Sequence, residues 1–205
     1  MIRTSKSMMA ALAALALGAC DSATATDGGS GTMQVAARGD DAPAASMAPS
    51  AQGPSYATST AQGTITFNAR VYAQAASGGW VELTNGAAQQ ATVDAAGRGA
   101  AAVFASSQVD ASTYSRVRVV FQNVNASLTS GLQVSTGLLT GSVAVTAQSG
   151  NTITVERQVS THVSAGGSTQ VLLNLNADAW MSHASATTHT VSEADFASAV
   201  QVTAQ

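Results

Sequence analysis

The only thiol in this 205-residue chain belongs to Cys20, which ends the sequence Leu-Gly-Ala-Cys at residues 17–20. An apolar run of about ten residues, 8–17, leads up to it, and Arg3 and Lys6 precede that run. This is the three-part layout of a secretory signal, with a positive region, an apolar region and small residues at the cut. The apolar run has about half of the roughly 20 residues that a membrane-spanning helix needs. We therefore expect residues 1–19 to be a cleaved signal peptide.

Cleavage before Cys20 would leave a nucleophilic thiol on the first residue of the mature chain, where it can take a thioether-linked diacylglycerol. Residues 17–20 resemble the lipobox of bacterial lipoproteins at all four positions. Each buried methylene of an acyl chain contributes roughly 0.8 kcal/mol to membrane binding, so several chains together anchor a protein. The resemblance implies lipidation of Cys20, attachment to a membrane through N-terminal acyl chains, and a place in the bacterial cell envelope. That place is the periplasmic face of the inner or outer membrane, or the cell surface. The alternative is an ordinary signal peptide with a chance cysteine.

Other residue types that do chemistry are few and scattered. The three histidines, His162, His183 and His189, stand in no motif with carboxylates or cysteine, whereas zinc binding and acid–base catalysis need several such groups together. Residues 97–102 (GRGAAA) mimic a dinucleotide-binding turn, but a strand-like run follows them where that motif requires a helix. We predict no metal, no cofactor and no catalytic residue, and surface positions for the histidines.

Two tryptophans are the candidate ligand-binding residues. Trp80 follows a Gly-Gly pair at the start of a strand-like segment, and Trp180 lies in the C-terminal part of the chain. Each is either part of the core or an exposed ring on which a sugar or a peptide stacks. Residues 38–40 spell Arg-Gly-Asp, an integrin-recognition tripeptide. Because tripeptides recur by chance, we do not predict cell adhesion from it.

Composition narrows the classes of function. The chain has 8 basic and 11 acidic residues, and removal of Arg3 and Lys6 with the signal leaves 6 against 11, with no lysine. Charged residues are only 9% of the total, against a usual quarter. An acidic chain without basic clusters lacks the electrostatic basis for binding nucleic acid or anionic lipid. We predict no nucleic-acid partner, and with a single cysteine no intrachain disulfide is possible.

The elements that must position these residues are nearly all strands. Residues 63–71 and 114–128 alternate between apolar and polar side chains, which is typical of half-buried strands. Further strands are expected at 31–38, 80–83, 91–95, 102–106, 138–147, 151–164, 169–175 and 200–203. Glycine, serine and asparagine turns separate these nine or ten strands, a spacing that predicts a β-sandwich or barrel rather than parallel βαβ units.

Only one helix is expected. It covers residues 192–199, where Ser192 can cap the N-terminus and Asp195 completes a capping box. Residues 42–62 contain all three prolines and form a long loop. We expect a lipidated N-terminus with a flexible tether at 20–30, and one β-domain at 31–205.

Tyr114 opens the most strand-like segment and follows Asp110 by four residues. This arrangement predicts a tyrosine corner, in which the phenol hydroxyl bonds to the backbone a few residues upstream and fixes a crossover between strands. The alternative is a ligand-stacking role for Tyr114.

Six short segments carry a second resemblance, in their order and spacing along residues 31–180. They are GT at 31–32, DAP at 41–43, RVY at 70–72, SGGWVEL at 77–83, ASTYSRVRV at 111–119 and LLNLNAD at 172–178. Together they resemble a domain-of-unknown-function family of bacterial and archaeal cell-envelope lipoproteins. The resemblance implies a β-sandwich that is prealbumin-like (carboxypeptidase-regulatory-like). Together with the strand pattern and the capping box, we expect an all-β fold: an antiparallel β-sandwich, prealbumin-like or immunoglobulin-like, with one short C-terminal helix. It implies no activity. Ser112 replaces a usual glycine, and Asn174 and Asn176 replace frequent carboxylates, so a cation site is not carried over.

Three functions remain open. The first is a non-catalytic, lipid-anchored envelope protein, either structural or binding an envelope protein or polysaccharide. The second is a carbohydrate- or peptide-binding accessory domain with Trp80, Trp180 or loop 42–62 at its site. The third is a hydrolase, which the scarcity of convergent histidines and carboxylates disfavours. Exposed aromatic rings on one sandwich face would favour the second function. A deep pocket with three or more polar titratable groups would favour the third.

Overall fold

The computed structural model describes residues 28–40, 60–148 and 150–205. The predicted signal peptide, Cys20, most of the tether and most of loop 42–62 lie outside the described residues. Thirteen strands and two helices form within the described ranges. The strands are β1 (Ser30–Arg38), β2 (Gly63–Ala75), β3 (Trp80–Glu82), β4 (Gln89–Asp94), β5 (Ala102–Asp110), β6 (Ser112–Leu128), β7 (Leu132–Val134), β8 (Gly137–Leu139), β9 (Ser142–Thr146), β10 (Thr152–Val163), β11 (Ser168–Asn174), β12 (Thr190–Ser192) and β13 (Gln201–Ala204), and the helices are α1 (Ala177–Met181) and α2 (Glu193–Ala199).

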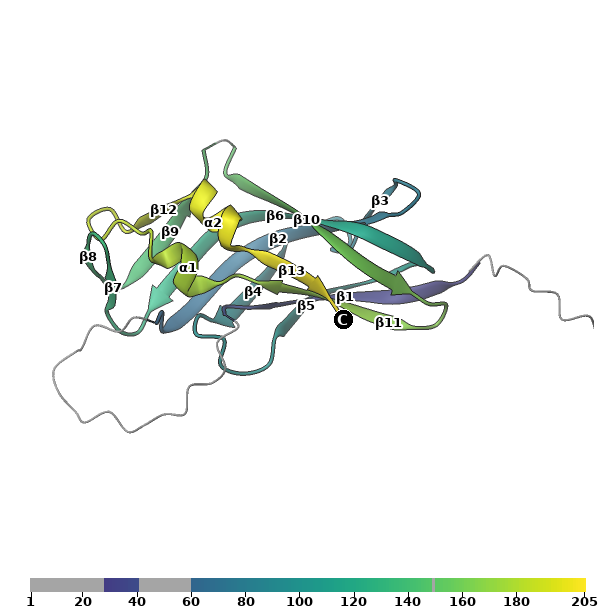
Figure 1. Ribbon diagram of the computed structural model, residues 1–205, viewed down its shortest axis with the longest axis horizontal. Helices are drawn as coiled ribbons and strands as arrows, with labels where there is room; N and C mark the ends of the chain where they lie inside the picture. Colours follow the sequence, from purple (N-terminus) through teal and green to yellow (C-terminus); the bar gives the residue numbers. More distant parts are fainter. Residues whose placement is uncertain (1–27, 41–59, 149) are drawn as a thin grey trace, which may run out of the picture.

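Two main sheets make an elongated sandwich, with most strands running near its long axis (Figure 1). The smaller sheet has the order β13-β11-β1-β5. The larger sheet has the order β12-β9-β6-β2-β3, with β10 also on β6 and β4 also on β2. The short hairpin β7–β8 stands apart. The predicted all-β sandwich is confirmed, but its sheets are mixed. β1 lies parallel to β11, and β9 lies parallel to β12, while the other pairs within the described residues are antiparallel.

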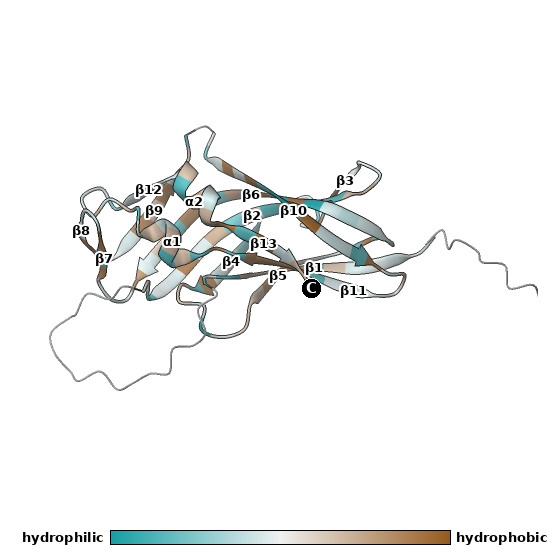
Figure 2. Cartoon of the chain, viewed as in Figure 1, coloured by the Kyte–Doolittle hydropathy of each residue, from teal (hydrophilic) through white to brown (hydrophobic). Residues whose placement is uncertain are grey.

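The core lies between the sheets and follows directly from the alternation in sequence. In β2 the side chains of Ile65, Phe67, Ala69 and Val71 are fully buried, while the residues that alternate with them are half-buried. Val117 and Val119 of β6 are also fully buried. Figure 2 shows apolar and polar residues alternating along these strands, as expected for sheets that bury one face.

β6 is the axis of the larger sheet. One side pairs with β2 along nearly its whole length, and the other side pairs first with β10 and then with β9. The exchange occurs at a β-bulge, where the register with β2 shifts and Asn123 has φ 51°. Asparagine tolerates this left-handed conformation better than most residues, and bulges increase the local twist. β6 can therefore serve two neighbouring strands in succession.

The two helices lie in the half of the molecule away from the start of β1 (Figure 1). α2 confirms the predicted helix: the Ser192 hydroxyl accepts from the Asp195 amide at 3.2 Å. Arg157 of β10 holds the other end, donating to the carbonyls of Ala197 and Val200 at 2.5 and 3.1 Å. α1 is not predicted from the sequence, and it starts after Asn176, which has φ 47°.

A chain of aromatic rings joins the helices to the sheets. The rings make edge-on contacts in the order Phe104, Phe67, Phe121, Phe196 and Trp180, with centroid separations of 5.2–5.7 Å. Such edge-to-face pairs are favourable beyond the area they bury. The helices therefore pack onto the core and are not surface additions. Among the described residues, no helix is long and apolar enough to cross a membrane.

Candidate functional site

Trp180 is part of the core. Its side chain is fully buried at the end of the aromatic chain, against Phe196. The indole Nε1 is buried without a hydrogen-bond partner among the described residues. The candidate role of Trp180 as an exposed ligand-stacking ring is therefore wrong, because α1 turns the ring inward and leaves no face for a ligand. The other alternative stated for Trp180, a place in the core, is what the structure shows, although α1, only five residues long, is not predicted from the sequence.

Trp80 lies on the surface. It opens β3, which pairs with the edge of β2, and its side chain is half-exposed. The guanidinium carbon of Arg118 lies 4.2 Å from the centre of its indole ring, which is a cation–π contact. Because Val117 and Val119 face the core, Arg118 must project from the outer face of the larger sheet. Trp80 is thus an aromatic group on that outer face.

Two arginines of β6 share one carboxylate on this face. Glu156 of β10 stands opposite Arg118 in the ladder and accepts from its Nε and Nη2 at 3.1 and 3.0 Å through Oε2. Its Oε1 accepts from Nη1 of Arg116 at 3.0 Å. The hydrogen bond from Arg118 is the main reason that the pKa of Glu156 lies below its ordinary value, and the bond from Arg116 adds to it. One carboxylate therefore holds two guanidinium groups side by side.

A second ion pair continues the face toward its edge. Arg70 of β2 donates from Nε and Nη2 to the two carboxylate oxygens of Glu82, at 3.0 and 3.2 Å. Its guanidinium carbon lies 6.0 Å from the ring centre of Tyr72. Burial raises the pKa of Glu82, but hydrogen bonds from Thr84 and Arg70 outweigh it, so the pKa of Glu82 is lowered.

We call this region the arginine–tryptophan surface. Its members are Arg70, Tyr72, Trp80, Glu82, Arg116, Arg118 and Glu156. A shallow hollow of about 230 Å³ adjoins it, lined by Arg116, Glu156, Arg157 and Gln158. Guanidinium forks bind carboxylates, and aromatic rings stack on flat apolar faces. The sequence predicts a shared face for Arg116 and Arg118, but the approach of Trp80 and Glu156 depends on strand register, which it does not reveal.

Tyr114 makes the contact that a tyrosine corner requires. Its side chain is 1% exposed, and its hydroxyl donates to the carbonyl oxygen of Asp110 at 3.0 Å. Burial raises the pKa of the Tyr114 phenol, and the charge of Asp110 raises it further. This burial leaves no ring face for a ligand, so Tyr114 fixes the turn between β5 and β6.

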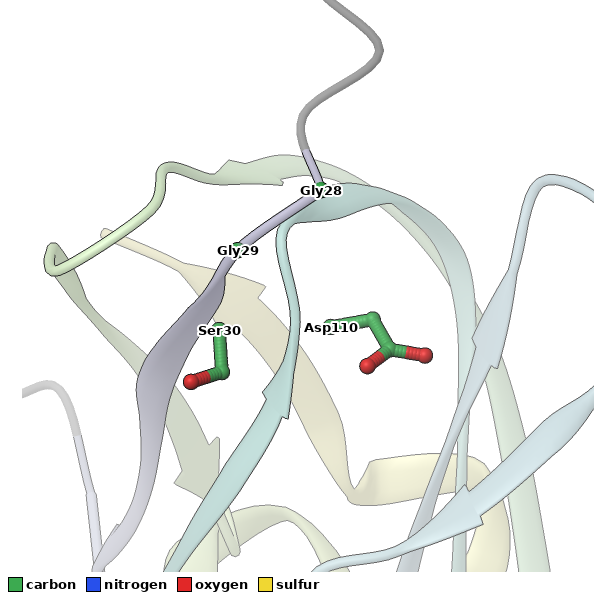
Figure 3. Close-up of a pocket in the computed structure, with 4 residues that line it drawn as sticks. All are labelled: Gly28, Gly29, Ser30 and Asp110. Atoms are coloured by element: carbon green, nitrogen blue, oxygen red, sulfur yellow. The ribbon is translucent and has the colours of Figure 1, made fainter.

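An open hollow of about 650 Å³ lies at the end of the sandwich where β1 begins. Gly28, Gly29, Ser30 and Asp110 line it (Figure 3). Ser30 and Asp110 face each other in the β1–β5 ladder, but their side chains point in different directions. Among the described residues that line it, Asp110 is the one titratable group.

The histidines are dispersed. His162 and His183 are exposed and His189 is half-buried, on separate segments. His162 lies on β10, with its Nδ1 3.4 Å from the Thr113 hydroxyl. Within ranges 28–40, 60–148 and 150–205, no group of three histidine, cysteine or carboxylate side chains could hold a metal ion.

The Arg-Gly-Asp tripeptide at 38–40 is not displayed as an adhesion loop. Gly39 is buried, and a Cβ there would overlap the carbonyl oxygen of Asp94. The turn at 97–102 leads into β5 and not into a helix, as the sequence predicts.

One pair of carboxylates, Asp40 and Asp178, is not predicted from the sequence. Asp178, in the first turn of α1, accepts from the Ala61 amide at 2.5 Å, and its own amide donates to Asp40 at 3.4 Å. Burial raises the pKa of Asp178 and the Asp40 charge raises it further, while the bond from Ala61 acts in the opposite direction. Asp178 is more than 100 positions from both Ala61 and Asp40, so no local pattern could bring it to them.

Comparison with known proteins gives one match. No curated protein and no solved structure matches the chain. Residues 53–190 match the family model described as Domain of unknown function (DUF4382). The match spans β2 to the first residue of β12, so β1, α2 and β13 lie outside it. The predicted resemblance starts earlier, at residue 31, and stops earlier, near 180. Since the match covers more than half of the chain, the protein belongs to the DUF4382 family of domains of unknown function.

Proposed function

We propose that the protein is a lipid-anchored, non-catalytic module of the bacterial cell envelope. The observation that carries the proposal is the position of Cys20 relative to the fold. The ten residues from Cys20 to Gly29 precede β1, and they would span at most about 33 Å at roughly 3.3 Å per residue. Acyl chains on Cys20 would therefore hold the sandwich close to a bilayer, with the start of β1 nearest to it.

The fold agrees with this proposal in two respects. We infer a prealbumin-like arrangement, because two largely antiparallel sheets enclose one core with few helical residues. The carboxylates on the outer face of the larger sheet, Glu82 and Glu156, are paired with arginines and held ionised. A general acid or base needs a pKa near the working pH, and these groups have theirs shifted away from it.

Lipid attachment is tested by metabolic labelling with radioactive palmitate, followed by flotation of membranes. The wild-type protein should take up label and float with the membranes, whereas Cys20→Ala should do neither. Ser22→Ala, next to the site but outside the four lipobox positions, is the matched control and should behave as wild type. Equal labelling and flotation of Cys20→Ala would refute the anchor.

The non-catalytic part is tested with a generic aryl ester. The purified protein should not accelerate ester hydrolysis above the rate in buffer. Ser30, beside Asp110 in the terminal hollow, is the serine to substitute if turnover is seen. Hydrolysis by the wild type that is lost in Ser30→Ala would establish an enzyme and end this proposal.

A carbohydrate- or peptide-binding accessory domain is the second candidate. The half-exposed ring of Trp80, stacked on Arg118 in an outer face, favours it, because sugar- and peptide-binding sites use such rings. Trp180 and Tyr114, both buried, make no contribution to it.

A further inference from the structure

We propose that the arginine–tryptophan surface binds an acidic polysaccharide, with carboxylates of the polymer on the arginines and sugar rings against Tyr72 and Trp80. The inference deepens the second candidate function and rests on it. It does not depend on lipid attachment.

The distribution of charge points to an anionic ligand. Three of the six arginines after Cys20 lie on this surface, with two carboxylates, Glu82 and Glu156. The other three arginines share the remaining chain with nine carboxylates. A polyanion is therefore repelled by most of the molecule and attracted to this one face, which favours encounter there.

The arginines also have guanidinium N–H groups that can donate hydrogen bonds to a ligand. Glu156 serves both Arg116 and Arg118, so the two guanidinium groups share a single negative charge. Arg116 is the more exposed of the two, with 48% of its side chain accessible, and its bond to Glu156 uses Nη1. A fork of Nε and Nη2 fits a carboxylate with two parallel hydrogen bonds. Arg116 is thus the group best placed to hold a uronate.

The layout of the face suits a polymer. The register places Glu82, Tyr72, Arg118 and Glu156 in one row across four strands, and Trp80, Gln74, Arg116 and Gln158 in the next. Neighbouring strands are about 4.8 Å apart. That spacing is close to the length of one sugar residue in an extended polysaccharide, so successive sugars can meet successive strands. The hollow of about 230 Å³ beside Arg116 has room for one sugar ring.

The same features argue against a lipid headgroup as the ligand. Binding to a bilayer surface normally adds apolar groups that insert among the acyl chains. Among the described residues the exposed large hydrophobic side chains are Val103 and Leu138, and neither belongs to this face. A soluble acidic polymer needs no such insertion.

The test uses the full-length protein, purified in mild detergent, with polygalacturonate as the probe and dextran as the neutral comparison. Affinity electrophoresis through gels containing each polymer measures binding. Polygalacturonate should retard the wild-type protein, and added salt should weaken the retardation, while dextran should have no effect. Arg116→Gln should lower the affinity at least tenfold, Arg116→Lys should lower it less, and Trp80→Ala should lower it about fivefold.

Arg98→Gln is the matched control. Arg98 lies in the turn after β4 and is similarly exposed. It also forms an ion pair, with Asp94, the last residue of β4. This variant should bind within twofold of wild type. Equal loss in Arg98→Gln and Arg116→Gln, or no retardation by polygalacturonate, would overturn the inference. Thermal unfolding of each variant shows whether a loss of binding comes from unfolding.

Two further outcomes separate this inference from the proposed function. Equal retardation by dextran and polygalacturonate would overturn the acidic class of ligand but keep a carbohydrate-binding module. Full-length Cys20→Ala that binds phosphatidylglycerol vesicles through Arg116, and not polygalacturonate, would assign the surface to lipid instead. Failure of every binding assay, with palmitate labelling intact, would overturn the binding inference but keep the proposal of a lipid-anchored module.

Discussion

Single hydrogen bonds of the buried Tyr114 and the half-buried Asp178 connect separate segments of the backbone in this sandwich. The turn from β5 to β6 is fixed by the Tyr114 hydroxyl on the carbonyl of Asp110, at 3.0 Å. The carboxylate of Asp178 accepts from the Ala61 amide. Each contact joins a buried or half-buried side chain to the backbone, so we expect its removal to lower the unfolding free energy.

Replacing Tyr114 with phenylalanine keeps the ring in the core but removes the hydroxyl. We expect a loss of about 1–3 kcal/mol in unfolding free energy, because the Asp110 carbonyl loses its partner. Tyr72→Phe, on the half-exposed outer face, is the control and should change stability by less than about 0.5 kcal/mol. Urea denaturation measures both. An unchanged midpoint for Tyr114→Phe would mean that water replaces the phenol without cost.

The pKa of Asp178 gives a prediction with a defined sign. Because its pKa in the folded protein is raised above the ordinary 3.8, the folded state binds this proton more tightly than the unfolded chain does. Ionisation of Asp178 therefore weakens the fold as pH rises through the folded pKa. Asp178→Asn keeps an oxygen for Ala61 and should be more stable than wild type at pH 7. The advantage should vanish below pH 3.8. Thermal midpoints across this range measure the gap, with Asp110→Asn, at an exposed residue, as the reference. A gap that widened in acid would contradict the prediction.

At the level of elements, strands were easier to predict than their partners. The alternation at 63–71 and 114–128 appears in the structure as β2 and β6 with nearly the same bounds. Their neighbours depend on contacts between distant residues. The parallel pairing of β1 with β11 joins segments more than 130 residues apart, and no local pattern encodes it.

The short elements were the ones missed. α1 has five residues and no side-chain cap, and it is held by burial of Ala177, Trp180 and Met181. Five residues are too few to show a helical period, so the helix that buries Trp180 could not be predicted. Only part of the arginine–tryptophan surface could be predicted, because its other members come from strands whose register the sequence does not reveal. One strand supplies Arg116 and Arg118, but the register of β3 and β10 brings Trp80 and Glu156 to them.

The start of β2 contains a glycine that the packing requires. Gly63 has φ +141°, and a Cβ there would overlap the carbonyl oxygen of Ser127 in β6. Gly78 also has positive φ, +100°, but nothing lies within 4 Å of its Cβ position. Strain from φ costs on the order of 1–3 kcal/mol at either site, and the overlap adds about 1–3 kcal/mol at Gly63 alone. Denaturation of Gly63→Ala and Gly78→Ala should show that difference, and equal losses would contradict the close approach.

At the scale of the whole molecule, the aromatic chain makes the sheets and helices one cooperative unit. Phe196 touches both Phe121 of β6 and Trp180 of α1, with centroid separations of 5.2 and 5.6 Å. Phe196→Ala should cost about 3–5 kcal/mol, because it leaves a cavity between the helices and the larger sheet. Val103→Ala, at a residue that is 54% exposed, should cost little. A calorimetric unfolding transition that stays single in both variants would show that the helices unfold together with the sheets, and a separate early transition would show that they do not.

The placement of β1 bears on how the molecule carries mechanical load. β1 is the first described strand, and it is hydrogen-bonded on both sides, to β11 in parallel and to β5 in antiparallel register. A pull through the residues before Gly28 acts along the strand, while the bonds of the antiparallel ladder are perpendicular to it. Both ladders then resist in shear, with many bonds sharing the force instead of opening one after another. A load applied through the N-terminal end would thus meet two hydrogen-bonded ladders that resist together.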